Sequence, residues 1–444
     1  MSLRKWIGCL GAVCLCCGCG DDAPAPGKRP PGGNGPDPAE KESYRLFMGN
    51  THAHCRYSGD AVQTDENSVE NHFRLAKANG YDFYCVTDHS QYESYTPQAW
   101  EHIKAAADAA TDASFVAIRG YEHSENNGPG AKGHQNVYNS SDYLNALAEG
   151  IDMPYFHNWL ADAANAGAFV SMNHPGKEQY GGFACYNEQA RPHIRLIELI
   201  NGTDDYHESF LAALAKGWKV SPVAGCDKHA TKPIAAWQPR TGVAAKKLTR
   251  ESLLEAMAAG RTYATYDKNL RLLYYVNNHV MGSEIRTSAD ELTFEIEASD
   301  PDTSDASDRI VRIEIVGEGN RVVASETFSA HRVDWKVRVP RGQKYYYLKV
   351  YTASSDAPTA YADVWKMDIS FAPVADGRRS GQRRQPEPAA EHGDALRGGR
   401  AEQQLCLRHY AGPRRIHVVR HRERSRPLRR QDDPPLPAFP GQSA

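Results

Sequence analysis

The sequence lacks the glycine-rich loops of the common nucleotide-binding folds. Its 444 residues contain no Walker-type GxxxxGK[ST] stretch, and no GxGxxG stretch leads from a predicted strand into a predicted helix. Such loops cradle phosphate groups with backbone N–H groups at the start of a helix. Their absence makes a nucleotide cofactor an unfavoured interpretation.

Closely spaced cysteines are lacking outside the first nineteen residues, which hold five of the ten cysteines. The remaining five are spread along the chain without CxxC spacing: Cys55, Cys85, Cys185, Cys226 and Cys406. This spacing favours neither a disulfide framework nor a thiolate metal cage, although a single bridge stays open.

A net positive charge is lacking in the body of the chain. Residues 377–444 contain 15 Arg against 7 Asp or Glu, a net charge of +8, so subtracting it from the total of −3 leaves −11 for the remainder. A protein that coats nucleic acid needs a basic face. We therefore expect no stable nucleic-acid partner.

The two ends of the chain differ from its body. Residues 1–19 have the layout of a secretory signal, and the run "LCCGC" ending at Cys19 resembles the lipobox of bacterial lipoproteins. We expect an exported protein, either a membrane-anchored lipoprotein or a periplasmic or extracellular one, with the lipid as its only membrane contact. Residues 20–43 read as a disordered linker. Residues 373–444 read as a disordered Arg/Pro-rich tail, whose composition is also typical of a shifted reading frame.

Short apolar strands alternate with helical patterns over residues 44–268. Helical spacing of apolar residues is clearest over 67–80, 97–111 and 249–260. Strand-like runs such as "YDFYCVTDHS" (81–90) and "HIRLIELING" (193–202) separate them. This alternation predicts an α/β fold with a parallel sheet and outer helices, either open or closed into a barrel.

Ionisable residues stand where these strands end. Asp88 and His89 end one predicted strand, and Glu122 and His174 end two others. Asp227 and His229 end a fifth predicted strand. Active sites of parallel α/β folds gather at the carboxyl ends of strands. "THAH" (51–54) adds two histidines whose i, i+2 spacing brings both side chains to one face of an extended chain. Converging imidazoles predict a metal site.

Residues 269–372 show a different pattern. About seven short runs of alternating residues, among them "ELTFEIEAS" and "KYYYLKVYTA", are separated by turn residues and show no helical spacing. This pattern predicts a β-sandwich. It carries no evident catalytic cluster, so we interpret it as a packing or binding domain.

Five motifs follow one another in an order that resembles the polymerase and histidinol phosphatase (PHP) family of metal-dependent hydrolases. They are "THAH" (51–54), "TDHS" (87–90), "GYEHS" (120–124) with "GHQN" (133–136) downstream, "NHPG" (173–176) and "GCDKH" (225–229). The stretch "RTGVAAKKLTRESLLEAMAAGRTYAT" and the sandwich after it are similar to the carbaryl-hydrolase-like branch. The resemblance implies a distorted (β/α)7 barrel over residues 44–268, followed by the β-sandwich.

The resemblance also implies a site with two or three divalent ions, of zinc, manganese or iron. The implied ligands of the first ion are His52, His54, Glu122 and Asp227. Those of the second are His89 and His229 with Asp60, and those of the third are His134 and His174 with Glu122 bridging. Asp227 and His229 are also the implied catalytic residues.

Imidazole and carboxylate ligands together suit such ions. The ions would lower the pKa of bound water toward about 7, which supplies hydroxide at neutral pH. We expect a metal-dependent hydrolase of small-molecule esters, most simply a phosphoesterase. A carboxyl- or carbamate-ester hydrolase and an inactive cell-surface binding protein are the alternatives. The sequence does not indicate an oligomeric state.

Overall fold

The computed structural model describes residues 38, 40–124, 133–176, 179–183, 189–235, 239–362 and 365–367. The expected signal and lipobox over 1–19, most of the expected linker over 20–43 and the expected tail over 373–444 lie outside the described residues. Among the helices of the described part, none combines the length and apolar character needed to cross a membrane.

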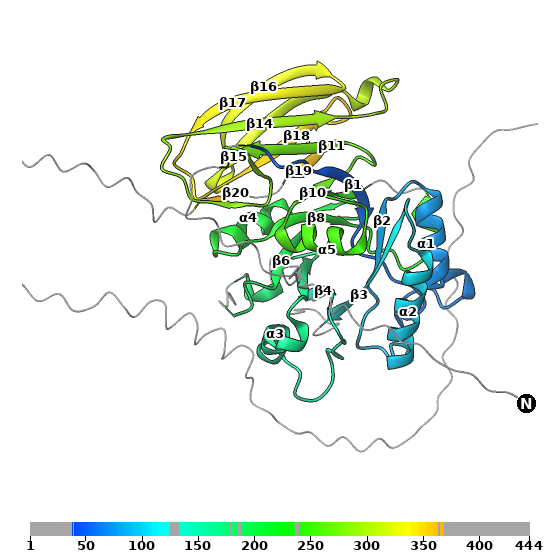
Figure 1. The fold of residues 1–444 in the computed structure, drawn as a ribbon. Helices are drawn as coiled ribbons and strands as arrows, with labels where there is room; N and C mark the ends of the chain where they lie inside the picture. The colour runs from blue at the N-terminus through cyan, green and yellow to red at the C-terminus, as the bar shows by residue number, and fades with distance from the viewer. Residues whose placement is uncertain are drawn as a thin grey trace, which may run out of the picture.

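The fold is of the mixed α/β class, with one large sheet and few helices (Figure 1). Six strands of this sheet run parallel to one another: β1 (Arg45–Asn50), β2 (Phe83–Val86), β3 (Val116–Ser124), β5 (Phe169–Asn173), β6 (Ile194–Asn201) and β8 (Ser221–Gly225). Strands β9 (Arg240–Ala245) and β10 (Thr262–Thr265) extend it in antiparallel fashion beside β1. The two-residue strand β7 (Asp204–Asp205) pairs with the end of β6.

The expected alternation of strand and helix fails between β3 and β5. Strand β4 (His134–Tyr138) pairs antiparallel with both of them. Only nine residues separate the end of β3 from the start of β4, whereas a crossover between parallel strands needs a dozen or more. Strand β4 therefore runs in the opposite direction beside β3, and its start lies at the edge where β3 and β5 end.

The helices among the described residues pack against the strands, and most of them start at a residue whose side chain caps the helix. They are α1 (Val69–Ala78), α2 (Pro97–Ala110), α3 (Met153–Ala161), α4 (His207–Ala215) and α5 (Arg250–Ala259). Side chains of Ser68, Thr96 and Thr249 accept a hydrogen bond from the backbone N–H three residues on, which satisfies a donor that has no partner within the helix. Helix α5 ends at Gly260 with φ of 76°, a left-handed conformation that favours glycine.

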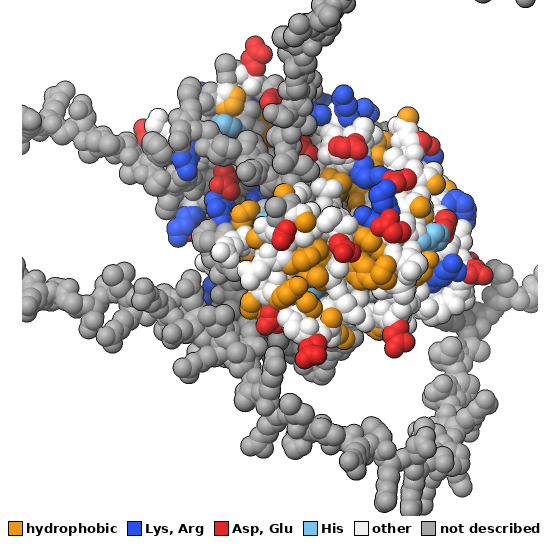
Figure 2. Space-filling model, turned by 60° about the horizontal axis from the view of Figure 1, so that its bottom comes forward, with side chains coloured by type: hydrophobic (Ala, Val, Ile, Leu, Met, Phe, Trp, Pro, Cys, Tyr) orange, Lys and Arg blue, Asp and Glu red, His pale blue; other side chains and the backbone are white. Residues whose placement is uncertain are grey.

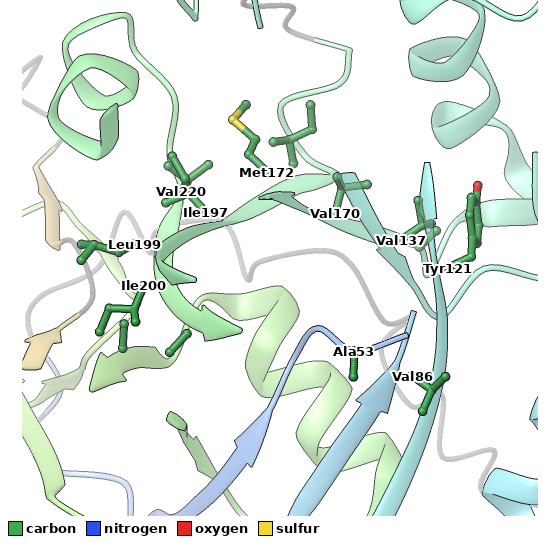
Figure 3. Packing of buried hydrophobic residues seen from close by; sticks show 14 of the residues in the cluster. Ala53, Val86, Tyr121, Val137, Val170, Met172, Ile197, Leu199, Ile200 and Val220 are labelled. Carbon is green, nitrogen blue, oxygen red and sulfur yellow. The ribbon is translucent and has the colours of Figure 1, made fainter. Parts of the chain in front are cut away.

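Both faces of the parallel strands are buried, as their nearly unbroken apolar sequences require. Along β2, Tyr84 and Val86 join the apolar cluster that includes residues of α1 to α4, whereas Phe83 and Cys85 join the cluster that includes α5. Figure 3 shows part of the first cluster, with Val137 and Val170 on neighbouring strands. Polar side chains that form a site are therefore expected at the ends of these strands rather than on their faces.

The described chain after residue 270 forms strands that pair antiparallel, with one exception. One sheet has the order β12 (His279–Val280), β11 (Arg271–Val276), β14 (Glu291–Ser299), β17 (Arg332–Pro340). The other strands are β13 (Glu284–Ile285), β15 (Ile310–Gly317), β16 (Arg321–Ala330), β18 (Tyr345–Thr352), β19 (Ala360–Ala362) and β20 (Trp365–Met367). The exception is that β13 and β20 pair in parallel.

Side chains from both groups meet in one apolar cluster, in which Phe294 of β14 contacts Tyr346 of β18 edge to face at 5.7 Å. Figure 1 shows these strands gathered at one end of the molecule. Strand β19 pairs with β10 on one side and β18 on the other, which joins them to the large sheet.

Candidate metal centre

The two histidines of "THAH" stand just after strand β1 and are fully buried. Their Nε2 atoms are 3.0 Å apart, and Ala53 between them makes a parallel bridge to Lys228. The bridge keeps this stretch extended, so the i, i+2 side chains share a face. This confirms the expectation that His52 and His54 converge on one point.

Two carboxylates complete a compact group with these histidines. Glu122 Oε2 is 3.2 Å from His52 Nε2 and 3.3 Å from His54 Nε2. Asp227 Oδ1 is 3.4 Å and 2.9 Å from the same two atoms. Ligand atoms held about 2.0–2.2 Å from a tetrahedral ion are about 3.3–3.6 Å apart. These four residues therefore have the spacing of one four-coordinate metal site.

The carboxylate of Glu122 tests whether this group suits a cation. The side chain is fully buried, and its Oε2 accepts no hydrogen bond from the described residues. Three imidazole nitrogens nevertheless lie within 3.1–3.3 Å of that oxygen. A buried carboxylate surrounded by lone-pair donors is costly unless a positive charge joins them. The donor set therefore fits a metal ion.

The second expected set lies on the more open side of the centre. Asp60 Oδ2 is 3.4 Å from Nε2 of both His89 and His229. His54 stacks on these two histidines at 4.5 Å and 4.1 Å between ring centroids. Nitrogens of all three histidines lie within 4.8 Å of one another. The structure thus brings the three residues of this set together and adds His54 to the histidines among them.

The third expected set meets at the other oxygen of Glu122. Nδ1 of His134 and Nε2 of His174 are each 3.3 Å from Glu122 Oε1. His134 reaches this edge because it opens the antiparallel strand β4, opposite Ser124 and Asn173. Ligand atoms of Glu122 and His134 also lie within 4.8 Å of one from His89, however, so His89 joins this group as well. All nine expected ligands lie in one contiguous cluster.

The carboxylates and imidazoles of the cluster shift one another's pKa values. Burial alone would lower the pKa of His52, but the surrounding carboxylates raise it well above its ordinary value. Burial would also lower the pKa of His54, but the neighbouring carboxylates of Asp227 and Glu122 raise it to about 9. Burial would raise the pKa of Glu122, yet the imidazoles hold it well below its usual range. The cluster therefore stabilises positive charge at its centre.

Sequence reasoning missed Glu198, which supports the centre from strand β6. Its Oε1 is 2.7 Å from His52 Nδ1, so Nε2 of that histidine is left to face the cluster. Its Oε2 accepts from the backbone N–H of His174 at 2.8 Å and from Asn201 Nδ2 at 2.9 Å. A carboxylate within the otherwise apolar run "LIELI" was the signal, because such a side chain is buried only with partners.

Other short contacts orient the remaining ligands. Ser58 Oγ lies 2.8 Å from His54 Nδ1, and Ser124 Oγ lies 2.8 Å from His89 Nδ1. Asn173 Nδ2 donates to Glu122 Oε1 at 2.9 Å. Asp88 accepts from the backbone of Cys55 at 2.7 Å and thereby shapes the turn after "THAH". Such contacts fix which ring nitrogen of a histidine faces a metal.

The backbone of "GCDKH" is specialised at two positions. A Cβ on Gly225 would lie 2.1 Å from Glu198 Oε1 and 2.7 Å from His52 Cβ, so only glycine lets the glutamate pass. Asp227 has φ of 48°, and His174 in the neighbouring motif has φ of 27°. Such left-handed conformations cost energy in residues other than glycine and concentrate at functional sites.

His123 lies next to Glu122 but takes no part in the centre. Its ring stacks on Phe156 of α3, with 4.1 Å between centroids and 4° between planes. This is the opposite face of β3, as alternation along a strand requires.

Comparisons with known proteins found similarity to solved structures but to no protein-family model or curated protein. A two-domain protein from Bacteroides vulgatus ATCC 8482, described as containing a predicted PHP-like metal-dependent phosphoesterase, is 19% identical with a TM-score of 0.43, over 73% of this chain and 96% of that one. PsfC from Pseudomonas syringae PB-5123 is 18% identical with a TM-score of 0.37, over 49% of this chain and 90% of that one.

A third solved structure is Endonuclease Q, described as a complex with a 27-mer duplex carrying an abasic lesion. It is 13% identical with a TM-score of 0.33, over 48% of this chain and 56% of that one. The expectation of no nucleic-acid partner stays a prediction for this chain. The face in Figure 2 has apolar side chains at its middle and basic ones interspersed with acidic ones. With TM-scores below 0.5, the three likenesses decide neither reaction nor residue roles, and the carbaryl-hydrolase branch also stays a prediction.

Proposed function

We propose that this protein is a metal-dependent hydrolase of the PHP family that cleaves phosphoester bonds. The observation that carries the proposal is the position of Glu122, whose two oxygens face different sets of imidazoles. A shared carboxylate between sets of neutral ligands allows two or three cations to sit close together. We assign His52, His54, Glu122 and Asp227 to one ion, and His89, His229 and Asp60 to a second. His134 and His174 with Glu122 would hold a third.

Bound ions would act as Lewis acids toward the substrate and would activate water. The residues of the chain hold and orient this arrangement. Four carboxylates (Asp60, Glu122, Glu198 and Asp227) would face six positive charges if three divalent ions were bound. The resulting net positive centre favours an anionic phosphoester over a neutral ester. Asp60 and His229 are partly exposed, so substrate would approach from their side.

We further propose that residues 44–268 form a distorted (β/α)7 barrel and residues 269–372 a β-sandwich. Closure of the barrel is supported by contacts between β8 and the strands β9 and β10. Thr241 Oγ1 donates to Ala224 O at 2.8 Å and accepts from Ala224 N at 2.8 Å. Thr262 Oγ1 donates to Pro222 O at 2.9 Å. The sandwich is supported by the shared apolar cluster of the antiparallel strands.

Metal analysis combined with a substrate panel tests the proposal. The full chain, expressed with zinc, manganese and iron available, is expected to carry two or three transition-metal ions and to release phosphate or alcohol from phosphate mono- or diesters. Hydrolysis of aryl esters or carbamates alone would favour the carboxyl-ester alternative. Less than one ion per chain, with no hydrolysis restored by added metal, would leave only a binding protein.

A pair of neighbouring substitutions sharpens this test. Glu122→Gln keeps the size of the side chain but removes the charge between the ions, so metal content should fall by at least one ion. Activity should fall by more than the roughly 10–100-fold typical of supporting contacts. His123→Ala is the matched control, because that ring packs on Phe156 away from the centre. Loss of metal in His123→Ala but not in Glu122→Gln would refute the assignment of β3 side chains.

A further inference from the structure

A second candidate cation site, separate in sequence from the histidine centre, consists of aspartates alone. Asp267 follows strand β10, Asp300 follows β14, and Asp308 ends the 3-10 helix η5 (Ala306–Asp308) before β15. One carboxylate oxygen from each lies within 4.8 Å of the other two. Three loops therefore bring three negative charges to one place.

Asp300 is the residue that points to a ligand. The residue is only 2% exposed, and its Oδ2 is shielded from solvent and accepts no hydrogen bond from any described residue. Its Oδ1 accepts from the backbone N–H of Asp302 at 2.8 Å. In the turn of Asp267, the side-chain oxygen of Asn269 is also shielded and has no hydrogen-bond donor among the described residues. A buried carboxylate oxygen without a donor needs a cation or a proton.

The charges around Asp300 make it costly to leave the group uncompensated. Burial, together with the carboxylates of Asp267 and Asp308, raises the pKa of Asp300 to about 6. Lys268, the neighbour of Asp267, pairs at 2.7 Å with Asp302 rather than with one of the three carboxylates. Asp305 is occupied in capping η5, where it accepts from Ser307 N at 2.9 Å. A bound cation would offset the mutual repulsion of the three carboxylates.

The donor chemistry selects the kind of cation. The group offers carboxylate oxygens without imidazole or thiolate, which suits a hard ion rather than zinc or iron. Calcium binds oxygens at about 2.3–2.6 Å, so two of its ligands stand at most about 5 Å apart, which accommodates the observed spread. Magnesium needs near-ideal octahedral geometry at about 2.0–2.1 Å, which three loops rarely provide.

We propose that Asp267, Asp300 and Asp308 form a calcium-binding site that ties the turn after β10 to the loop between β14 and β15. The site holds together the junction between the large sheet and the later antiparallel strands. It is separate from the histidine centre and does not depend on the proposed hydrolase activity.

Calcium titration of the full chain tests the site, with Asp300→Asn as the variant and Asp305→Asn as the matched control. Asparagine at 305 still caps η5 and leaves the three ligands in place. Isothermal titration calorimetry should show one more calcium ion per chain for the wild type and the control than for Asp300→Asn. Equal stoichiometry in all three proteins would overturn the proposal.

Thermal unfolding gives a second readout that a folding defect cannot imitate. At about 5 mM calcium, a site of the weak extracellular kind would be largely filled. The melting temperature of the wild type should then rise by on the order of 3–5 °C. Asp300→Asn should melt no lower than the wild type without calcium, because it removes a buried repulsion, and should not respond to the ion. A loss of stability without calcium, with the calcium response intact, would contradict the proposal, and an equal response to magnesium would overturn the choice of ion.

Discussion

The residues of the histidine centre divide into those that can face an ion and those that orient them. Glu198 belongs to the second kind, because its oxygens contact His52 Nδ1 and the backbone N–H of His174 rather than the centre itself. A carboxylate behind a histidine fixes the ring tautomer and strengthens its free nitrogen as a ligand. The same side chain explains why position 225 is glycine.

Replacing Glu198 by Gln should therefore weaken metal binding without abolishing the fold. The amide keeps an oxygen for His52 but loses the charge and presents N–H groups toward the N–H of His174. We expect metal affinity, measured by competition with a chelator, to fall by about 10–100-fold. Glu251→Gln, on the exposed side of α5, is the control. Unchanged affinity in Glu198→Gln would show that the contact with His52 does not orient the ring.

At the scale of elements, helix α1 places a polar side chain in the protein core. His72 lies on the buried face of α1, where its Nε2 is 2.8 Å from Asn67 Oδ1. Burial, and to a lesser degree the charge of His54, lowers the pKa of His72 to about 3. The residue is therefore neutral in the folded protein across the ordinary pH range but titrates near 6.5 in the unfolded chain.

The free energy of unfolding should consequently fall as the pH drops below about 6.5. The unfolded chain binds a proton at His72 that the folded protein does not bind until about pH 3, so acid favours unfolding. Between pH 7.5 and 5 this histidine should account for a loss of about 2 kcal/mol. Denaturant unfolding of His72→Gln at saturating metal should show that much less pH dependence. His102→Gln, on the neighbouring helix α2, is the control, and an identical slope in His72→Gln and wild type would contradict the assignment.

The elements show how far sequence reasoning reaches. Apolar spacing predicted α1, α2 and α5 within a few residues, because each buries one face and starts at a capping side chain. The strand ends were predictable because a short buried run that stops at Asp, His or Glu marks the edge of a parallel sheet. The direction of β4 could not be predicted, because the sequence between β3 and β4 does not show whether the next strand runs parallel or antiparallel. Glu198 escaped because it stands inside its strand rather than at the end.

At the scale of the whole molecule, the two ends of the chain carry their own predictions. The lipobox-like run ending at Cys19 predicts that this cysteine is lipidated, which would hold the protein at a membrane surface. Cys19→Ser should then move the full chain from the membrane fraction to the soluble fraction of a bacterial host, with its metal content unchanged. Ala replacing Cys14 is the control. Membrane retention of the Cys19 variant would count against the lipobox interpretation.

The pairing of β19 with both β10 and β18 limits how the later strands can be exchanged during evolution. Strand β19 has three residues and hydrogen-bonds both β10 and β18, while Met48, Ala244 and Tyr263 of the first part lie in the apolar cluster of the second. A gene cut after codon 268 would encode a sheet with an exposed edge at β10 and an uncovered apolar surface, both of which promote aggregation. Exchange of the later strands by gene fusion therefore requires a donor segment that brings its own equivalent of β19.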